Sequence, residues 1–215
     1  TEKLYKMKIT AQQVNELRKL TGAGMMDCKK ALVETEGDME KAIDVLRKKG
    51  QKVAAKRADR DADEGVVLAK VNDDGTFAAA VMINCETDFV AKNSDFIAYA
   101  QTILDLAVAS KAKDADTLKA MNLNGRTVDE SITDQTGVIG EKIQMGRYEI
   151  VEAASAFAYI HPGNRIATIA GLNKAGDFNA VGKDVVMQIA AMAPIALNQE
   201  SIPQDVIDRE IEVGK

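Results

Sequence analysis

The first fifty residues repeat apolar positions at the spacing of α-helices. One set of apolar residues, each three positions apart, consists of Val14, Leu17 and Leu20. This is the spacing of one helical face. A capping-box pattern from Thr10 to Gln13 comes before this set, and Gly22 follows it as a stop signal. We therefore expect a helix that begins at Ala11.

Two more helices are predicted before residue 51. The first, at about 24–36, has Met25, Cys28 and Leu32 on one face and ends at Gly37. Asp38 is a suitable N-cap for the next helix, which we expect to end at Gly50. Its apolar face consists of Met39, Ala42, Ile43 and Leu46. Residues 1–55 are thus expected to form a three-helix module.

The pattern then changes to that of a linker followed by a hairpin. From Gln51 to Glu64 the sequence is mostly Ala, Lys, Arg and Asp without an apolar stripe. We therefore place a linker at 56–64 and expect it to let the flanking modules move separately. The short apolar runs 66–71 and 77–84 are joined by a turn sequence ending in Gly75, so they are expected to pair as a hairpin.

After the hairpin, helical and strand-like segments alternate. Ser94 is expected to cap a helix whose apolar side comprises Phe96, Ala100, Ile103 and Ala107. A further helix is predicted at 127–143, strand-like runs at 147–160 and 165–172, and a helix at 178–192 that stops before Pro194.

A hairpin followed by helices therefore occurs twice, which predicts an α+β fold. We expect two related halves, each an antiparallel sheet with helices, at 65–146 and 147–200, the second incomplete. Ser201 to Pro203 opens one more helix, so 201–215 is expected to begin a helical extension.

Composition agrees with a folded, water-soluble protein. Of the 215 residues, 46% are hydrophobic and 28% are charged, and no apolar run approaches the ~20 residues needed to cross a bilayer. The start of the chain also lacks the apolar segment of a signal peptide, so we expect a cytoplasmic protein with no membrane partner. Two cysteines and a single histidine are too few for a four-ligand zinc site.

Charge is unevenly distributed along the chain. Residues 1–60 contain 15 Lys and Arg against 9 Asp and Glu, whereas the remainder contains 13 against 24. A basic head can bind an acidic protein surface or RNA. Because its lysines are interleaved with acidic residues and lack aromatic partners, we favour a solvated helical face, and we expect no binding to DNA.

Catalytic chemistry has few candidates here. An enzyme would have to combine Cys85 with His161, the only histidine, which precedes a Pro-Gly turn. The segment from Thr21 to Gly24 follows a helix and lacks the Gly-Lys-Ser/Thr ending of a phosphate loop. We therefore expect no catalytic residue, no metal, no cofactor and no nucleotide bound by this chain itself.

Binding chemistry is better supported. Met25 and Met26 point about 100° apart on a helix, so one of them should be exposed as an adaptable contact, with partial burial as the alternative. Asp88 is expected to cap the turn after the hairpin, which leaves Phe89 projecting beyond the sheet edge. Hydrophobicity alone instead favours Phe89 as a core residue.

Two runs carry a resemblance to a known family. The run from Thr21 to Leu32 reads TGAGMMDCKKAL, and the run from Asn84 to Lys92 reads NCETDFVAK. Together with Leu17-Arg18 and YIHPGNRI at 159–166, they resemble the bacterial elongation factor Ts family, across almost the whole chain. Members of that family usually continue beyond the point that matches residue 215, so we expect this chain to lack the C-terminal portion.

The resemblance implies a fold, a function and a set of contacts. The N-terminal module resembles the ubiquitin-associated fold. The implied function is guanine nucleotide exchange on elongation factor Tu, in its GDP form and nucleotide-free. The implied contact residues in the module are Leu17, Arg18, Met25 and Met26. In the core they are Thr87, Asp88, Phe89, Val90 and His161, with Phe89 as a wedge near the partner's magnesium site.

Two alternatives stay open at this point. The three helices alone can serve as a peptide-binding or ubiquitin-like adaptor, in which case binding would need only residues 10–50. A Cys-His enzyme is the less favoured alternative, and it would lose activity on Cys85→Ala.

Overall fold

The computed structural model describes residues 9–215, so residues 1–8 of the expected N-terminal module lie outside the described part. Three helices open it, α1 (Ala11–Thr21), α2 (Met25–Glu34) and α3 (Met39–Lys56). The predicted capping box of Thr10 and Gln13 is present, and Gly22 ends α1 with a left-handed φ of 69°. The side chain of Asp38 caps α3, as predicted. These helices pack around Val14, Leu17, Cys28, Ala31, Leu32 and Ala42.

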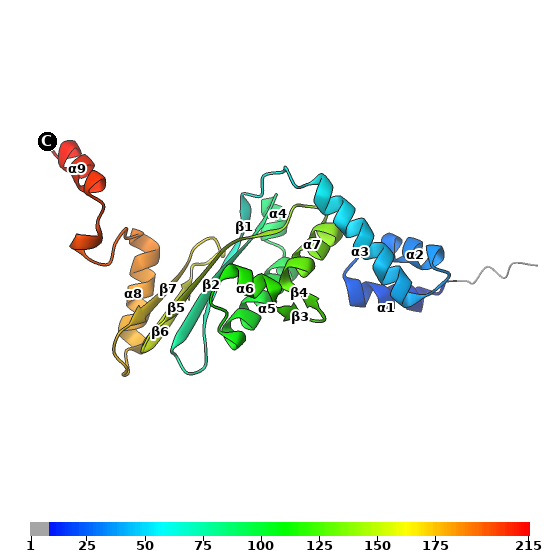
Figure 1. Ribbon diagram of the computed structural model, residues 1–215, viewed down its shortest axis with the longest axis horizontal. Coiled ribbons are helices and arrows are strands. Elements are labelled where there is room, and N and C mark those ends of the chain that lie inside the picture. The colour runs from blue at the N-terminus through cyan, green and yellow to red at the C-terminus, as the bar shows by residue number, and fades with distance from the viewer. Residues whose placement is uncertain (1–8) are drawn as a thin grey trace, which may run out of the picture.

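The third helix is longer than the sequence pattern predicts. It runs through Gly50 to Lys56, so the expected stop at Gly50 is wrong. Gly50 is buried, and its Cα faces Gly137 of α7 (Val128–Ile139). Because Gly137 has no side chain at this contact, the two helices approach closely, and the packing against α7 offsets the low helix propensity of Gly50. The three-helix module is thereby docked on α7, contrary to the expected freedom of movement (Figure 1).

A three-stranded antiparallel sheet forms the centre of the molecule. The predicted hairpin is confirmed as β1 (Glu64–Val71) paired with β2 (Phe77–Cys85). The third strand, β5 (Gln144–Glu152), pairs with the other edge of β2. The sequence pattern assigned most of this strand to the second half of the core. Its hydrogen bonds instead join it to the first hairpin across more than fifty residues of sequence.

Helices cover one face of this sheet. They are α4 (Asp88–Ala91), α5 (Ser94–Ser110), α6 (Ala115–Ala120) and α7, with a small hairpin of β3 (Asn122–Leu123) and β4 (Arg126–Thr127) before α7. The predicted apolar side of α5 is buried against the sheet. Its cap is Asn93 and not Ser94, because the Asn93 side chain accepts a hydrogen bond from the Asp95 backbone N–H at 2.8 Å.

A second hairpin packs against the central sheet. It consists of β6 (Ser155–Ile160) and β7 (Ala167–Leu172), joined by the predicted turn at 162–164. It contacts β1 and β2, and the backbone N–H of Val67 donates to the Asn164 carbonyl at 2.8 Å. Because β2 also buries Ala78, which points away from the helix-facing residues, that strand is covered on both faces.

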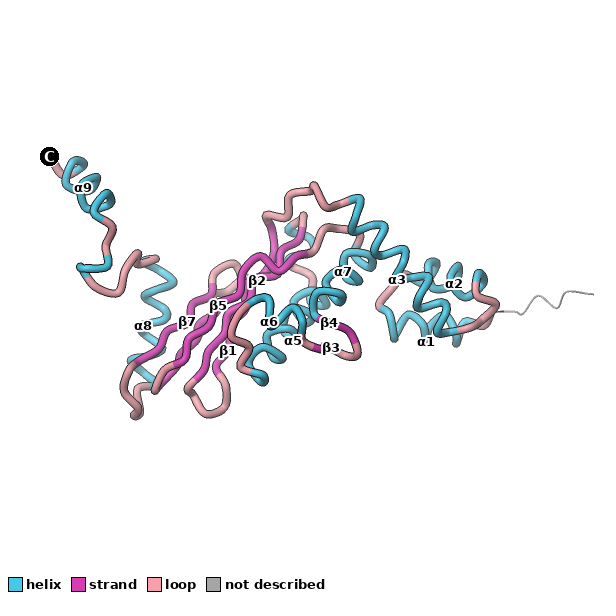
Figure 2. Tube along the Cα trace, viewed as in Figure 1, coloured by secondary structure: helices cyan, strands magenta, loops and turns pink. Residues whose placement is uncertain are grey.

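The C-terminal part contains a helix on this hairpin and a helix that stands away from it. Helix α8 (Asn179–Met192) packs on β6 and β7, with Gly182 against the ring of Phe157. A short 3-10 helix, η1 (Gln199–Ser201), leads to α9 (Gln204–Val213), which has no buried residue. Figure 2 shows α9 at the opposite end of the molecule from α1 and α2.

This arrangement confirms the predicted α+β class, with N-terminal helices and antiparallel strands covered by helices. The division of the core at residue 147 stays a prediction. Within residues 9–215, no helix combines the length and the apolar composition that a membrane span requires.

Candidate functional site

Phe89 is the most exposed aromatic side chain of the predicted site. It lies in α4, the single helical turn that follows β2, and 84% of its surface is accessible. Ala91, on the same turn, is buried, and Val90 packs partly against the main core. The turn is therefore anchored by its second half while the ring projects outward. The alternative that Phe89 is a core residue is wrong.

The cap of this turn is Thr87 and not Asp88. The Thr87 side chain accepts a hydrogen bond from the backbone N–H of Val90, and Asp88 is the first helical residue. The carboxylate of Asp88 instead pairs with the Lys92 ammonium group at 2.7 Å. The hydrogen bond from Lys92 holds the pKa of Asp88 below its ordinary value. Asp88 thus remains charged beside the exposed ring.

The N-terminal helices expose most of the predicted contact residues. Arg18 is exposed, and the accessible fractions of Met25 and Met26 are 53% and 61%. At least one exposed methionine was expected, and both are exposed. Leu17 differs from the expectation, because its side chain is fully buried in the core of the three helices. In this structure its side chain supports the fold of the module and does not lie on its surface.

Leu20 is an exposed apolar residue that the sequence pattern placed on the buried edge of α1. Its side chain is mostly accessible, beside the loop that leads to Met25. Spacing alone could not show this, because Leu20 continues the three-residue repeat of the buried Val14 and Leu17. Only the direction in which α2 and α3 pack decides which part of that edge is covered.

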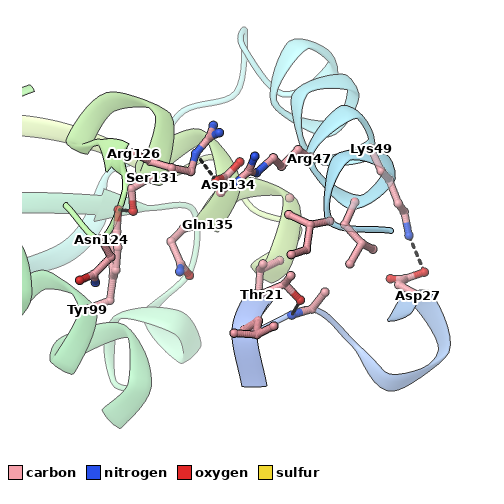
Figure 3. Close-up of a pocket in the computed structure, with 18 of the residues that line it drawn as sticks. Thr21, Asp27, Arg47, Lys49, Tyr99, Asn124, Arg126, Ser131, Asp134 and Gln135 are labelled. Atoms are coloured by element: carbon pink, nitrogen blue, oxygen red, sulfur yellow. Dashed lines mark hydrogen bonds and ion pairs between the residues drawn. The ribbon is translucent and has the colours of Figure 1, made fainter. Parts of the chain in front are cut away.

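A cavity of about 390 Å³ lies between the three-helix module and the core, beside the contact of α3 with α7. Figure 3 shows that it lies between the loop after α1, helix α3, the β3–β4 hairpin and the middle and end of α7. Arg126 and Asp134 form an ion pair of 2.8 Å at one wall, and Lys49 pairs with Asp27 at 2.5 Å at another. Burial raises the pKa of Asp134. The cavity marks the joint between the three-helix module and the core.

The two residues of the enzyme alternative are poorly suited to nucleophilic chemistry. Cys85 is fully buried, and burial together with the nearby carboxylate of Glu141 raises its pKa to about 11. Its thiol donates to the Thr87 carbonyl at 3.2 Å, and the raised pKa keeps the thiol protonated at neutral pH. His161 is exposed just before the turn at 162–164, and its Nδ1 lies 2.9 Å from the hydroxyl oxygen of Tyr159. Across residues 9–215, no cluster of His, Cys, Asp and Glu side chains is suited to hold a metal ion.

Comparison with known proteins gives a consistent result. The family described as "Elongation factor TS" matches residues 86–215. A protein named elongation factor Ts from Christiangramia forsetii is 55% identical over 209 residues, which cover 97% of this chain and 76% of that protein. For the elongation factor Ts of Porphyromonas gingivalis the values are 50% over 210 residues, 97% and 76%.

The coverage is smaller for some relatives. The elongation factor Ts of Parabacteroides distasonis is 50% identical over 209 residues, which cover 97% of this chain but only 62% of that protein. The matched regions include the exposed turn with Phe89 and the N-terminal helices with Met25 and Met26. From the sequence, the fold and these similarities together, the chain belongs to the elongation factor Ts family.

Proposed function

We propose that this protein is a guanine nucleotide exchange factor for elongation factor Tu. It binds the GDP form of that partner, weakens the contacts to magnesium and phosphate, and stabilises the nucleotide-free form until GTP enters. The observation that carries the proposal is the exposed ring of Phe89 at the tip of an anchored turn. A large apolar side chain in this position is suited to enter a pocket on another protein.

The proposed exchange involves no covalent step and no cofactor of this chain. By thermodynamic linkage, if this protein lowers the affinity of elongation factor Tu for GDP by some factor, GDP lowers the affinity of elongation factor Tu for this protein by the same factor. A shift of about 10⁴ requires about 5.5 kcal/mol of differential binding. A single aromatic anchor contributes about 2 to 4 kcal/mol, so a second contact surface is needed.

We assign that second surface to the N-terminal helices. Met25 and Met26 provide flexible apolar contacts and Arg18 provides a charge. Helix α3 docks on α7, which holds this surface in a fixed relation to the turn with Phe89. Two separated anchors in a fixed relation can bind one conformation of the partner more tightly than another and so stabilise its distorted form. His161 and its turn, at the end of β6, are assigned a supporting contact.

Release of fluorescently labelled GDP from elongation factor Tu, with and without this protein, tests the proposal. We expect faster release that saturates with the concentration of the added protein. Unchanged release at every concentration would overturn the proposal. Residues 9–56 alone are the matched comparison, since an adaptor would bind the partner through this part as tightly as the full chain does.

A further inference from the structure

The backbone that carries Phe89 is held by a carboxylate from a distant part of the chain. Glu141 follows Gly140, which ends α7 with a left-handed φ of 82°. Its Oε2 accepts hydrogen bonds from the backbone N–H groups of Glu86 at 3.1 Å and Thr87 at 3.0 Å. Its Oε1 accepts a third from the Thr87 hydroxyl at 2.7 Å. All three donors belong to the two residues that lead into α4.

The contact between Glu141 and Thr87 also fixes the cap of α4. A hydroxyl group has one proton, and in Thr87 this proton is donated to Glu141. The Thr87 oxygen is then oriented to accept from the N–H of Val90, at 3.4 Å. The Glu141 carboxylate therefore fixes the position of the backbone that enters α4 and the orientation of the Thr87 hydroxyl that caps it.

The two segments hold each other reciprocally. The Glu86 carboxylate accepts from the backbone N–H of Lys142 at 2.6 Å and from the Arg57 guanidinium at 2.7 and 2.8 Å. The Lys142 ammonium group donates to the carbonyls of Ala58 and Arg60, both at 2.8 Å. The entry to α4, the end of α7 and the residues after α3 thus meet at one point.

Such external support is needed because α4 has only four residues. A single helical turn is not stable by itself in water. The Phe89 ring is almost free of contacts within its own chain, so its direction depends on the backbone beneath it. An exposed anchor that is held in place loses less conformational entropy when it binds.

We propose that Glu141 is a positioning residue, which holds the entry to α4 so that the Phe89 ring stands in a fixed direction. The effect of Glu141 on the position of the turn does not depend on a partner. Its effect on nucleotide exchange rests on the proposed function. The two parts are tested by separate measurements.

The first measurement reports the mobility of the side chain at position 89. The chain has four tyrosines but no tryptophan, so Phe89→Trp introduces a single tryptophan, whose fluorescence can be excited selectively. Adding Glu141→Gln keeps the size of the side chain but replaces one acceptor oxygen by an NH₂ group that faces the donors. We expect lower fluorescence anisotropy, with the thermal unfolding midpoint of the core retained. Thr87→Val, a second variant, should lower the anisotropy in the same way.

Glu149→Gln is the matched control, because Glu149 is an exposed carboxylate on β5 that pairs, among residues 9–215, with Arg147 alone. It should leave the anisotropy unchanged. If Glu141→Gln and Thr87→Val also leave it unchanged, Glu141 does not position the ring. This result would overturn the inference whether or not the protein exchanges nucleotide.

The second measurement is GDP release in a double-mutant cycle. Glu141→Gln should slow release by roughly tenfold in the native background, the scale of losing a hydrogen bond to a charged group. In the Phe89→Ala background it should have no further effect, because a residue that acts through the ring has nothing left to position. An equal loss in both backgrounds, or no loss in the native one, would overturn the role of Glu141 in exchange.

Discussion

At the scale of single residues, Phe89 shows how exposure separates two roles that sequence alone leaves open. The ring is 84% accessible, so Phe89→Ala should barely change the thermal unfolding midpoint. GDP release should fall by about 30-fold, because truncating an interface anchor costs about 2 kcal/mol. A core phenylalanine would instead cost about 3 to 5 kcal/mol of stability. Thermal unfolding and release rates on one preparation distinguish these outcomes, and release at the native rate would remove Phe89 from the proposed wedge.

Glu86 gives a residue-scale prediction for pH. Hydrogen bonds from the Lys142 N–H and from Arg57 hold the pKa of Glu86 below its ordinary value of 4.5. The stability that this carboxylate contributes is therefore complete above pH 4.5 and is lost as the pH falls through the lower pKa of the folded state. Glu86→Gln should flatten the dependence of the urea midpoint on pH in that acidic window. Parallel curves for both proteins would contradict this assignment.

At the scale of elements, the contact between α3 and α7 should respond unequally to alanine substitution of its two glycines. A Cβ at Gly137 would overlap the Cα of Gly50, whereas a Cβ at Gly50 would lie 3.5 Å from the Cα of Gly137, an ordinary contact. Gly137→Ala should therefore separate the helices, while Gly50→Ala should be tolerated and gain up to about 1 kcal/mol of helix propensity.

Limited trypsin digestion measures this difference. Arg57 and Arg60 lie between α3 and β1 and are held by Glu86 and Lys142. They should be cleaved faster in Gly137→Ala and at the native rate in Gly50→Ala. Equal cleavage of the two variants would show that the glycine contact does not hold the module.

At the scale of the whole molecule, burial is concentrated in the central sheet and its helices. The main core cluster is built from residues between Val66 and Tyr148, whereas α8 buries only Gly182 and Val186, and α9 buries none. Local stability follows buried contacts. Backbone amides of α8 should thus exchange with solvent before those of β2 and α5. Mass-spectrometric hydrogen exchange measures this order, and equal or greater protection of α8 would contradict it.

The local signals in the sequence predict most elements of this fold. The capping box at Thr10, the cap at Asp38 and the turn before Phe77 determine where helices and strands begin, because they act within a few residues. The spacing of apolar residues likewise predicts the buried side of α5. These features also locate Met25, Met26 and Phe89 on short elements that can project from the surface.

Tertiary structure alone decides what meets across the chain. The pairing of β5 with β2, the passage of α3 over Gly137 and the hydrogen bonds of Glu141 to Thr87 join residues more than fifty positions apart. None of them leaves a local pattern, because each depends on how separate elements pack. Packing also buries Leu17 and exposes Leu20 on the same repeat. Sequence thus determined most of the elements, including the turn that carries Phe89, while packing determined that the ring is exposed and which groups hold that turn in place.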